Sequence, residues 1–302
     1  MIPDPSRPHV PTTATEGGSR SPWASSTAET TQGDTDERDS ASDGAAFFGL
    51  RATGQGRWEL PVTPEICSSR RTIFGGSAVG AAAEALELTT GQPLRWATVQ
   101  FLTFARPPQG LALEVDVLAE HDGLVHARLR ARTHDADVFL VTAALGCGPD
   151  AGRGVWARPT TSLPPSQCPA RPKPSRHIGT VMDRVETRLA VASHEALSPG
   201  QLGPGRGGLW VRVPDLPVSA AALGLVGDLV PSGMRYAVDR RIGGQSLDNS
   251  LRVLRLAPTD WYFVDVRVHG IGDGVAHTLA HLWSEDDVLL GTASQSTAVR
   301  EF

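Results

Sequence analysis

The amino-acid sequence predicts an α+β protein built from two similar halves, each with one buried helix and an antiparallel sheet. Two observations support this prediction. The strand-like segment "DVFLVTA" at 137–143 returns as "DVLLGTA" at 287–293, and Pro108 matches Pro258 at the same offset of 150 residues. In addition, a stretch rich in alanine and glycine precedes the strands of each half. The chain therefore carries one structural unit twice.

Each half begins with a predicted buried helix. The first, "FGGSAVGAAAEALELTTG" (74–91), starts at two glycines and stops at Gly91, a residue type that often ends helices. Its counterpart is "PVSAAALGLVGDLVP" (217–231). Both stretches are apolar nearly all round, which is typical of a helix enclosed by other elements.

Strands follow each helix. Residues 111–146 and 261–296 both alternate in polarity around His-Asp-Gly or Gly-Asp-Gly and then around an acidic turn. This pattern predicts a three-strand antiparallel meander in each half. One more strand lies upstream in each half, within 96–108 and 245–258. A helix wrapped by an antiparallel sheet, twice in tandem, is a double hotdog fold, so we expect two antiparallel sheets that each wrap a buried helix.

The repeat and the composition divide the chain into four parts. Residues 1–45 are rich in Ser, Thr, Pro, Asp and Gly and bury too little apolar surface to offset their ordering entropy, which predicts a disordered tail. Residues 46–147 form the first hotdog repeat. Residues 148–179 contain prolines that break helices and central strands, which predicts a linker. Residues 180–302 form the second repeat.

The bulk composition excludes several classes of partner. A net charge of -5 argues against a nucleic-acid binder, which needs a basic surface. The 3 cysteines are in no metal-ligand spacing, which fits a reducing cytoplasm and predicts no metal site. No stretch approaches the roughly 20 apolar residues of a membrane span. We therefore expect a cytoplasmic protein with neither nucleic acid nor membrane as a partner.

Several short motifs resemble those of one enzyme family. They are Phe74-Gly75-Gly76 before the first helix, "VQFLTFARP" (99–107), "GDLVPSG" (227–233), "SLDNS" (246–250) and "TASQS" (292–296). In this order and spacing the sequence resembles the type II acyl-CoA thioesterases over about residues 46–302. That family consists of double-hotdog enzymes that hydrolyse fatty acyl-CoA to free acid and coenzyme A. The resemblance implies no cofactor, because coenzyme A is part of the substrate.

The resemblance also implies catalytic residues. In the family, an aspartate of the second helix, a hydroxyl residue of the next strand and a glutamine of the last strand hold the attacking water. These positions fall on Asp228, Ser246 and Gln295 of this chain. Two positions depart from the family pattern, because Asn249 and Gln100 stand where histidine is common.

The repeat offers a separate argument for the same three residues. At the offset of 150, their counterparts in the first half are of packing type, namely Ala78 for Asp228, Trp96 for Ser246 and Leu145 for Gln295. A buried carboxylate without a partner is costly, so a polar set in one half alone favours chemistry over architecture. Asp228 would take a proton from water that Ser246 and Gln295 orient. A helix cap for Asp228 and ordinary strand positions for the other two remain open.

The two glycines before the first helix are candidates for the remaining part of the chemistry. The free N–H groups near Gly75 and Gly76 could hold a developing oxyanion. Close helix packing explains these glycines equally well. Arg240, Arg241 and Arg255 are candidates for contacts with the phosphates of coenzyme A, but the sequence does not assign the nucleotide site.

Thioester hydrolysis is the leading functional hypothesis, with acyl-CoA or an acyl-carrier protein as substrate. A hotdog dehydratase or hydratase is the first alternative, although such chemistry normally needs a histidine that neither Asn249 nor Gln100 supplies. A non-catalytic protein that binds acyl thioesters is the second. A homo-oligomer formed through the hotdog sheets is left open.

Overall fold

The structure is a computed structural model that describes residues 42–148, 152, 154–191, 203–230, 237 and 242–301. Residues 1–41 of the predicted tail lie outside the described residues. The next residues form helix α1 (Asp43–Phe48), whose N-cap Ser42 accepts a hydrogen bond from the Ala45 N–H at 3.3 Å. Regular structure therefore begins before the boundary at residue 45 that composition suggested.

Helices α2 (Gly75–Thr90) and α3 (Ala220–Gly227) lie where the sequence predicts them. Helix α2 ends at Gly91, which adopts the left-handed conformation with a φ of 65° and donates its N–H to the Glu87 carbonyl. Helix α3 is shorter. It is capped by the Ser219 hydroxyl, which accepts from the Ala222 N–H at 3.1 Å. None of the helices in the described part of the chain is long and apolar enough to cross a membrane.

The strands of the two halves follow the same order. Those of the first half are β1 (Arg51–Gly54), β2 (Arg57–Pro61), β3 (Leu94–Phe101), β4 (Gly110–His121), β5 (Leu124–Arg132) and β6 (Asp137–Gly146). Those of the second half are β7 (Glu186–Val191), β8 (Arg206–Arg212), β9 (Ile242–Ser246), β10 (Asp248–Val253), β11 (Tyr262–Gly272), β12 (Val275–Trp283) and β13 (Leu289–Glu301). The Asp-Gly turns between β4 and β5 and between β11 and β12 both have positive φ angles, as tight hairpins require.

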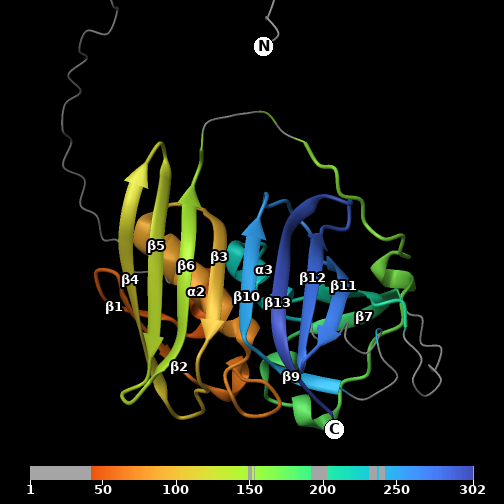
Figure 1. Cartoon of the computed structure of the whole chain (residues 1–302), viewed down its shortest axis with the longest axis horizontal. Helices are drawn as coiled ribbons and strands as arrows, with labels where there is room; N and C mark the ends of the chain where they lie inside the picture. Colours follow the sequence, from red (N-terminus) through yellow and green to blue (C-terminus); the bar gives the residue numbers. More distant parts are fainter. Residues whose placement is uncertain are drawn as a thin grey trace, which may run out of the picture. The chain divides into compact units, whose positions relative to one another are not determined.

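The described strands form one continuous sheet, where the sequence had suggested two. Its order is β1-β2-β4-β5-β6-β3-β10-β13-β12-β11-β8-β7, β9 also pairs with β13, and all of these pairings are antiparallel. Strands β3 and β10 lie side by side and join the halves (Figure 1), and the register places Asn249 opposite Val99. Each strand would otherwise be an exposed edge with unpaired backbone groups, so their pairing explains why the two predicted sheets merge.

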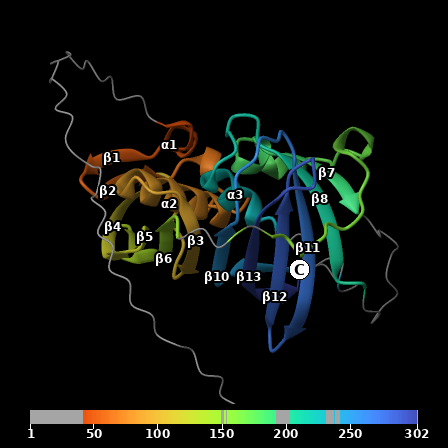
Figure 2. The ribbon, with the colours of Figure 1, turned by 90° about the horizontal axis from the view of Figure 1, so that it is seen from above.

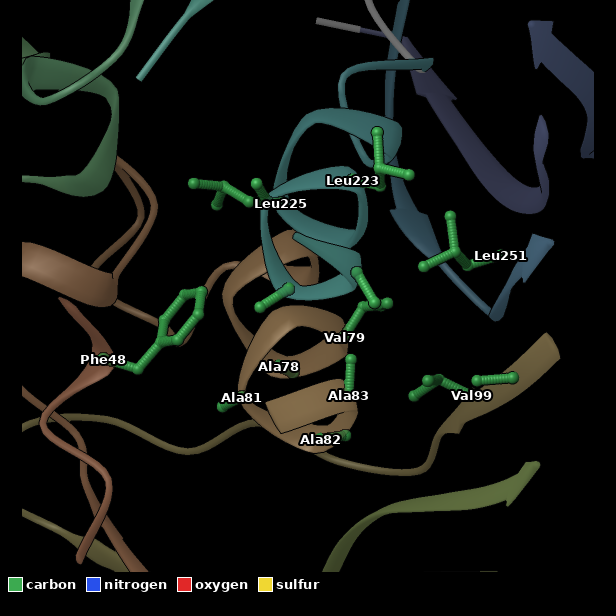
Figure 3. Packing of buried hydrophobic residues seen from close by; sticks show 14 of the residues in the cluster. Phe48, Ala78, Val79, Ala81, Ala82, Ala83, Val99, Leu223, Leu225 and Leu251 are labelled. Carbon is green, nitrogen blue, oxygen red and sulfur yellow. The ribbon is translucent and has the colours of Figure 1, made fainter. Parts of the chain in front are cut away.

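The helices lie on one side of this sheet (Figure 2), where α2 packs directly against α3. Glycines permit this contact. A Cβ atom added to Gly80 would lie 2.8 Å from the Ala221 carbonyl oxygen and 2.5 Å from Cζ of Phe48. One added to Gly224 would lie 3.0 Å from the Gly80 nitrogen. Figure 3 shows the two helices in contact, with Val99 and Leu251 beside them on the strands.

The helix contact shows that the two halves align with a different residue offset at the helices than at the strands. At the strands the offset of 150 holds, because Val99 and Asn249 pair with each other. At the helices, Gly80 contacts Gly224. The segment from Gly224 to Asn249 is longer than the segment from Gly80 to Val99, so the offset of 150 does not hold there. The structural counterpart of Asp228 is therefore Glu84 rather than Ala78. Glu84 is buried and accepts a hydrogen bond from the Ser42 hydroxyl, so the first half also carries an enclosed carboxylate.

The segment between the halves packs against both of them. It contains short 3-10 helices η2 (Pro165–Gln167) and η3 (Ser175–His177), followed by η4 (Val181–Asp183). Val181 donates its N–H to the Cys67 carbonyl of the first half, after 3-10 helix η1 (Pro64–Ile66). Thr160 donates its hydroxyl to the Asp265 carboxylate of the second half at 2.9 Å. The Thr160 contact lies within the linker at 148–179 and the Val181 contact lies directly after it, so both hold the linker against the two halves.

Substitution of Gly80 by alanine tests the close helix contact. Alanine raises intrinsic helix propensity, but its Cβ atom would overlap the Ala221 carbonyl and the Phe48 ring. We expect Gly80→Ala to lower the free energy of unfolding by about 1–3 kcal/mol in urea titrations. Gly270→Ala is the control, because no atom lies within 4 Å of the added Cβ there. Equal stability of both variants would show that the helices do not need this glycine.

Candidate active site

Asp228 is a buried carboxylate at the C-cap of α3, with 4% of its surface exposed. Its Oδ2 accepts a hydrogen bond from the Gly76 N–H at 2.8 Å. Its Oδ1 accepts from Gln295 Nε2 at 2.6 Å and from Asn249 Nδ2 at 3.2 Å. The carboxylate is thus held by one donor from the first half of the chain and two from the second.

Ser246 and Gln295 lie beside this carboxylate. Ser246 ends β9, Gln295 lies on the neighbouring β13, and Gln295 Nε2 contacts the Ser246 hydroxyl oxygen at 2.6 Å. The structure therefore brings together all three residues that the sequence proposed, from three elements. The Gln295 Oε1 is buried and has no hydrogen-bond partner among the described residues. Among the described residues this oxygen is therefore an unused acceptor, on the same amide group whose nitrogen contacts Asp228 and Ser246.

Burial raises the pKa of Asp228 from 3.8 to about 6. The hydrogen bonds from Asn249, Gly76 and Gln295 lower the pKa, but less than burial raises it. Removal from water disfavours the charged form, and donors directed at the oxygens favour it. The balance leaves a carboxylate that exchanges a proton close to neutral pH, as a general base requires.

The two glycines at the start of α2 have different surroundings. The Gly76 N–H is engaged by Asp228, so it supports the carboxylate and is not free for a substrate oxygen. For the Gly75 N–H, no acceptor is found among the described residues. Both positions exclude a side chain, because an added Cβ would lie 2.7 Å from Asp228 Oδ2 at Gly75 and 2.5 Å from the Leu225 carbonyl at Gly76. Close packing thus explains Gly76, and a free amide distinguishes Gly75.

The two departures from the family motif have different positions. Asn249 is buried and contacts Asp228, a role that the sequence reasoning missed. The alternation of residues along β10 could have indicated that Asn249 is buried, because it lies on the same face of the strand as the apolar Leu251 and Val253. Gln100 is exposed and pairs with Asp248 on the other face of the sheet. Gln100 is therefore not part of the site, and the residue opposite Asn249 is Val99.

A cavity of about 350 Å³ gives access to Asp228. The second half lines it with Asp228, Leu229, Gly244, Gln245 and Ser246. The first half and the linker supply the remaining wall, with Ser68, Ser69, Arg70, Thr72, Ile73, Phe74, Gly75, Phe101, Thr103, Phe104, Val138, Phe139, Arg171, His177 and Met182. The cavity is therefore built between the halves.

Comparison with known proteins identifies the class. Residues 165–299 match the family model of the acyl-CoA thioesterase C-terminal domain. No curated protein matches the chain. Among solved structures, a candidate thioesterase from Novosphingobium aromaticivorans has 26% identity and a TM-score of 0.71, over 82% of this chain and 97% of that chain.

Two further solved structures share the fold at lower identity. A hot dog fold protein from Alicyclobacillus acidocaldarius has 19% identity and a TM-score of 0.74, over 87% of this chain and 100% of that chain. The acyl-CoA thioesterase II TesB2 from Mycobacterium marinum has 17% identity and a TM-score of 0.67, over 86% of this chain and 98% of that chain.

The protein thus has a hotdog fold with a buried carboxylate cluster beside a cavity. Residues 165–299 of the chain match the acyl-CoA thioesterase C-terminal domain, and this match confirms the predicted resemblance to that family and the prediction of a thioesterase.

Asp228 makes the stability of the fold depend on pH. Because its folded pKa of about 6 exceeds the 3.8 of the unfolded chain, the native state binds the proton more tightly. Its stabilising contribution is complete below the unfolded pKa and is lost as pH rises through the folded pKa. Asp228→Asn removes this titration. We expect the unfolding free energy of the wild type to fall relative to Asp228→Asn by about 3 kcal/mol between about pH 3.5 and 7.5. Chemical denaturation at several pH values measures the difference, and a flat difference would contradict the assignment.

Proposed function

We propose that this protein hydrolyses an acyl-CoA thioester to a free carboxylic acid and coenzyme A, with water activated by Asp228. The observation that carries the proposal is the buried Asp228 carboxylate, with a pKa near 6, in a cavity with Ser246. The cavity wall is largely apolar, which suits an acyl chain or the pantetheine arm, and Asp228 and Ser246 place polar groups at one position in it.

The reaction proceeds by proton transfer and addition. Asp228 takes a proton from water, and the resulting hydroxide adds to the thioester carbonyl carbon. The Gln295 Oε1 and the Ser246 hydroxyl orient the water, since Oε1 is otherwise without a partner among the described residues. The Gly75 N–H, at the positive end of α2, donates to the oxyanion. When the carbon–sulfur bond breaks, the coenzyme A thiolate takes the proton back from Asp228.

The proposed site requires a tandem arrangement. We infer that residues 46–147 and 180–302 are two hotdog repeats related by duplication, joined by the linker at 148–179. The pairing of Val99 with Asn249, its equivalent at the repeat offset, supports a local twofold axis between the repeats. The second repeat supplies the base and the water-binding side chains, and the first supplies the start of α2.

The alternative of a dehydratase or hydratase has less support. Such an enzyme needs a histidine near the acid, and the described contacts of the Asp228 carboxylate are all with amide groups. The alternative of a non-catalytic thioester binder does not explain an unpaired buried acceptor beside a carboxylate that titrates near pH 6.

Asp228→Asn tests the general base directly. The amide has nearly the shape of the carboxylate but cannot accept the proton, so we expect the hydrolysis rate to fall by about 10²–10⁴-fold. Gln295→Ala should reduce the rate less, because it removes only one contact to the water. A thiol-specific reagent measures coenzyme A release from a panel of acyl-CoA substrates, and circular dichroism checks the fold. Near wild-type turnover by Asp228→Asn would place the base elsewhere.

The pH dependence of turnover provides a second test. We expect kcat/KM to rise with pH through an apparent pKa of about 6 and then level off, because only ionised Asp228 accepts the proton. The hydrogen bond from Asn249 lowers this pKa, so Asn249→Leu should move the rise to higher pH. A matched change on the other face of the same strand, Arg252→Leu, should leave the profile in place. If the pH profile of Asn249→Leu coincides with that of the wild type, Asn249 does not affect the pKa of the group that acts as the base.

A further inference from the structure

Basic side chains line the same cavity as the catalytic carboxylate. Arg70 comes from the segment before α2, and Arg171 and His177 come from the linker between the halves. These two segments are held together by the hydrogen bond from the Val181 N–H to the Cys67 carbonyl. Residues from both of them therefore form one wall of the cavity, and this wall carries positive charge.

The linker brings additional cations to this wall. Lys173 and Arg176 flank His177, and both are exposed. Burial lowers the pKa of His177, and the charges of Arg176, Arg171 and Lys173 lower it further. The Asp183 carboxylate raises the pKa of His177, with the smallest effect of these groups, and it accepts a hydrogen bond from the Gly179 N–H. The local field is positive, in a chain whose net charge is -5.

The chemistry of the ligand follows from this field and from the size of the cavity. A volume of about 350 Å³ is within the range of pockets for small ligands, and the phosphates of a nucleotide are strongly hydrated anions that stay at the surface. An arginine guanidinium binds phosphate oxygens through paired N–H donors. The acyl thioester would thus reach Asp228 through the cavity while its nucleotide remains outside, beside the basic wall.

We propose that Arg70, Arg171 and His177 form the site that binds the phosphates of coenzyme A. This inference rests on the proposed thioester hydrolysis and assigns its nucleotide-binding residues. It moves that site away from the arginines that the sequence suggested. Arg255 is absent from the described lining of the cavity, and Arg240 and Arg241 lie outside the described residues. The linker is then part of the substrate site as well as a connection.

A comparison of two substrates tests this site. One is an acyl-CoA, and the other is the acyl-pantetheine with the same acyl group, which lacks every phosphate. For Arg70→Gln and Arg171→Gln, we expect KM for acyl-CoA to rise about 3- to 10-fold each, with kcat unchanged. Turnover of acyl-pantetheine should not change. Arg252→Gln is the matched control, because it removes one exposed positive charge on the other face of the sheet.

Binding of adenosine 3′,5′-bisphosphate by calorimetry gives a readout that does not need catalysis. We expect it to bind the wild type and to bind both arginine variants more weakly, with the loss reduced at high salt. If the wild type hydrolyses neither thioester but binds the bisphosphate in this way, hydrolysis is wrong and the phosphate site stands. If hydrolysis is observed but both variants behave like Arg252→Gln, the phosphate site is wrong. Equal losses with acyl-CoA and acyl-pantetheine would also overturn it.

Discussion

The close contact between α2 and α3 is the constraint on which the site depends. Glycines at positions 80 and 224 allow the two backbones to approach, and the C-terminal end of α3 then meets the N-terminal end of α2. A carboxylate at the end of its own helix is electrostatically unfavourable, because helix C-termini carry partial negative charge. Asp228 instead faces the positive end of the other helix through Gly76. The half that supplies Asp228 therefore depends on the other half to stabilise the charge of this carboxylate.

The two halves use similar positions for different purposes. Glu84 stands after Gly80 as Asp228 stands after Gly224, and both carboxylates are buried. Glu84 is closed off by Ser42 at the start of α1, whereas Asp228 lines an open cavity. At the positions that would complete a first-half site, the chain has Val99 and Leu145 in place of Asn249 and Gln295. One scaffold thus holds an enclosed carboxylate in one half and a carboxylate that lines a cavity in the other.

The linker between the halves contributes residues to the cavity that Asp228 lines. It covers part of the second half through Thr160, and Val181, which follows it closely in the chain, contacts the first half. In doing so it brings Arg171 and His177 to the cavity that Asp228 and Ser246 also line, although these residues are far apart in sequence. Its prolines suit this role, because a segment without regular secondary structure can follow an irregular surface between two rigid units. The apolar depth of the cavity and its basic wall together match an acyl group joined to a charged carrier.

The sequence by itself predicted the repeated helix-and-strand units, the turns, the resemblance to acyl-CoA thioesterases, and the three residues Asp228, Ser246 and Gln295 that the structure brings together. These follow from local patterns and from motif order, which do not depend on knowing which segments touch. The tertiary structure decided which segments that are distant in sequence lie in contact, because local patterns carry no information on such contacts. Whether β3 and β10 pair, and whether Gly80 meets Gly224, depends on long-range packing. The offset that aligned Asp228 with Ala78 was wrong for this reason, because extra residues between helix and strand shift the helices without disturbing the strands. The proposed roles of Asn249, of the Gly75 N–H and of the basic linker residues likewise become visible only when the two halves are in contact.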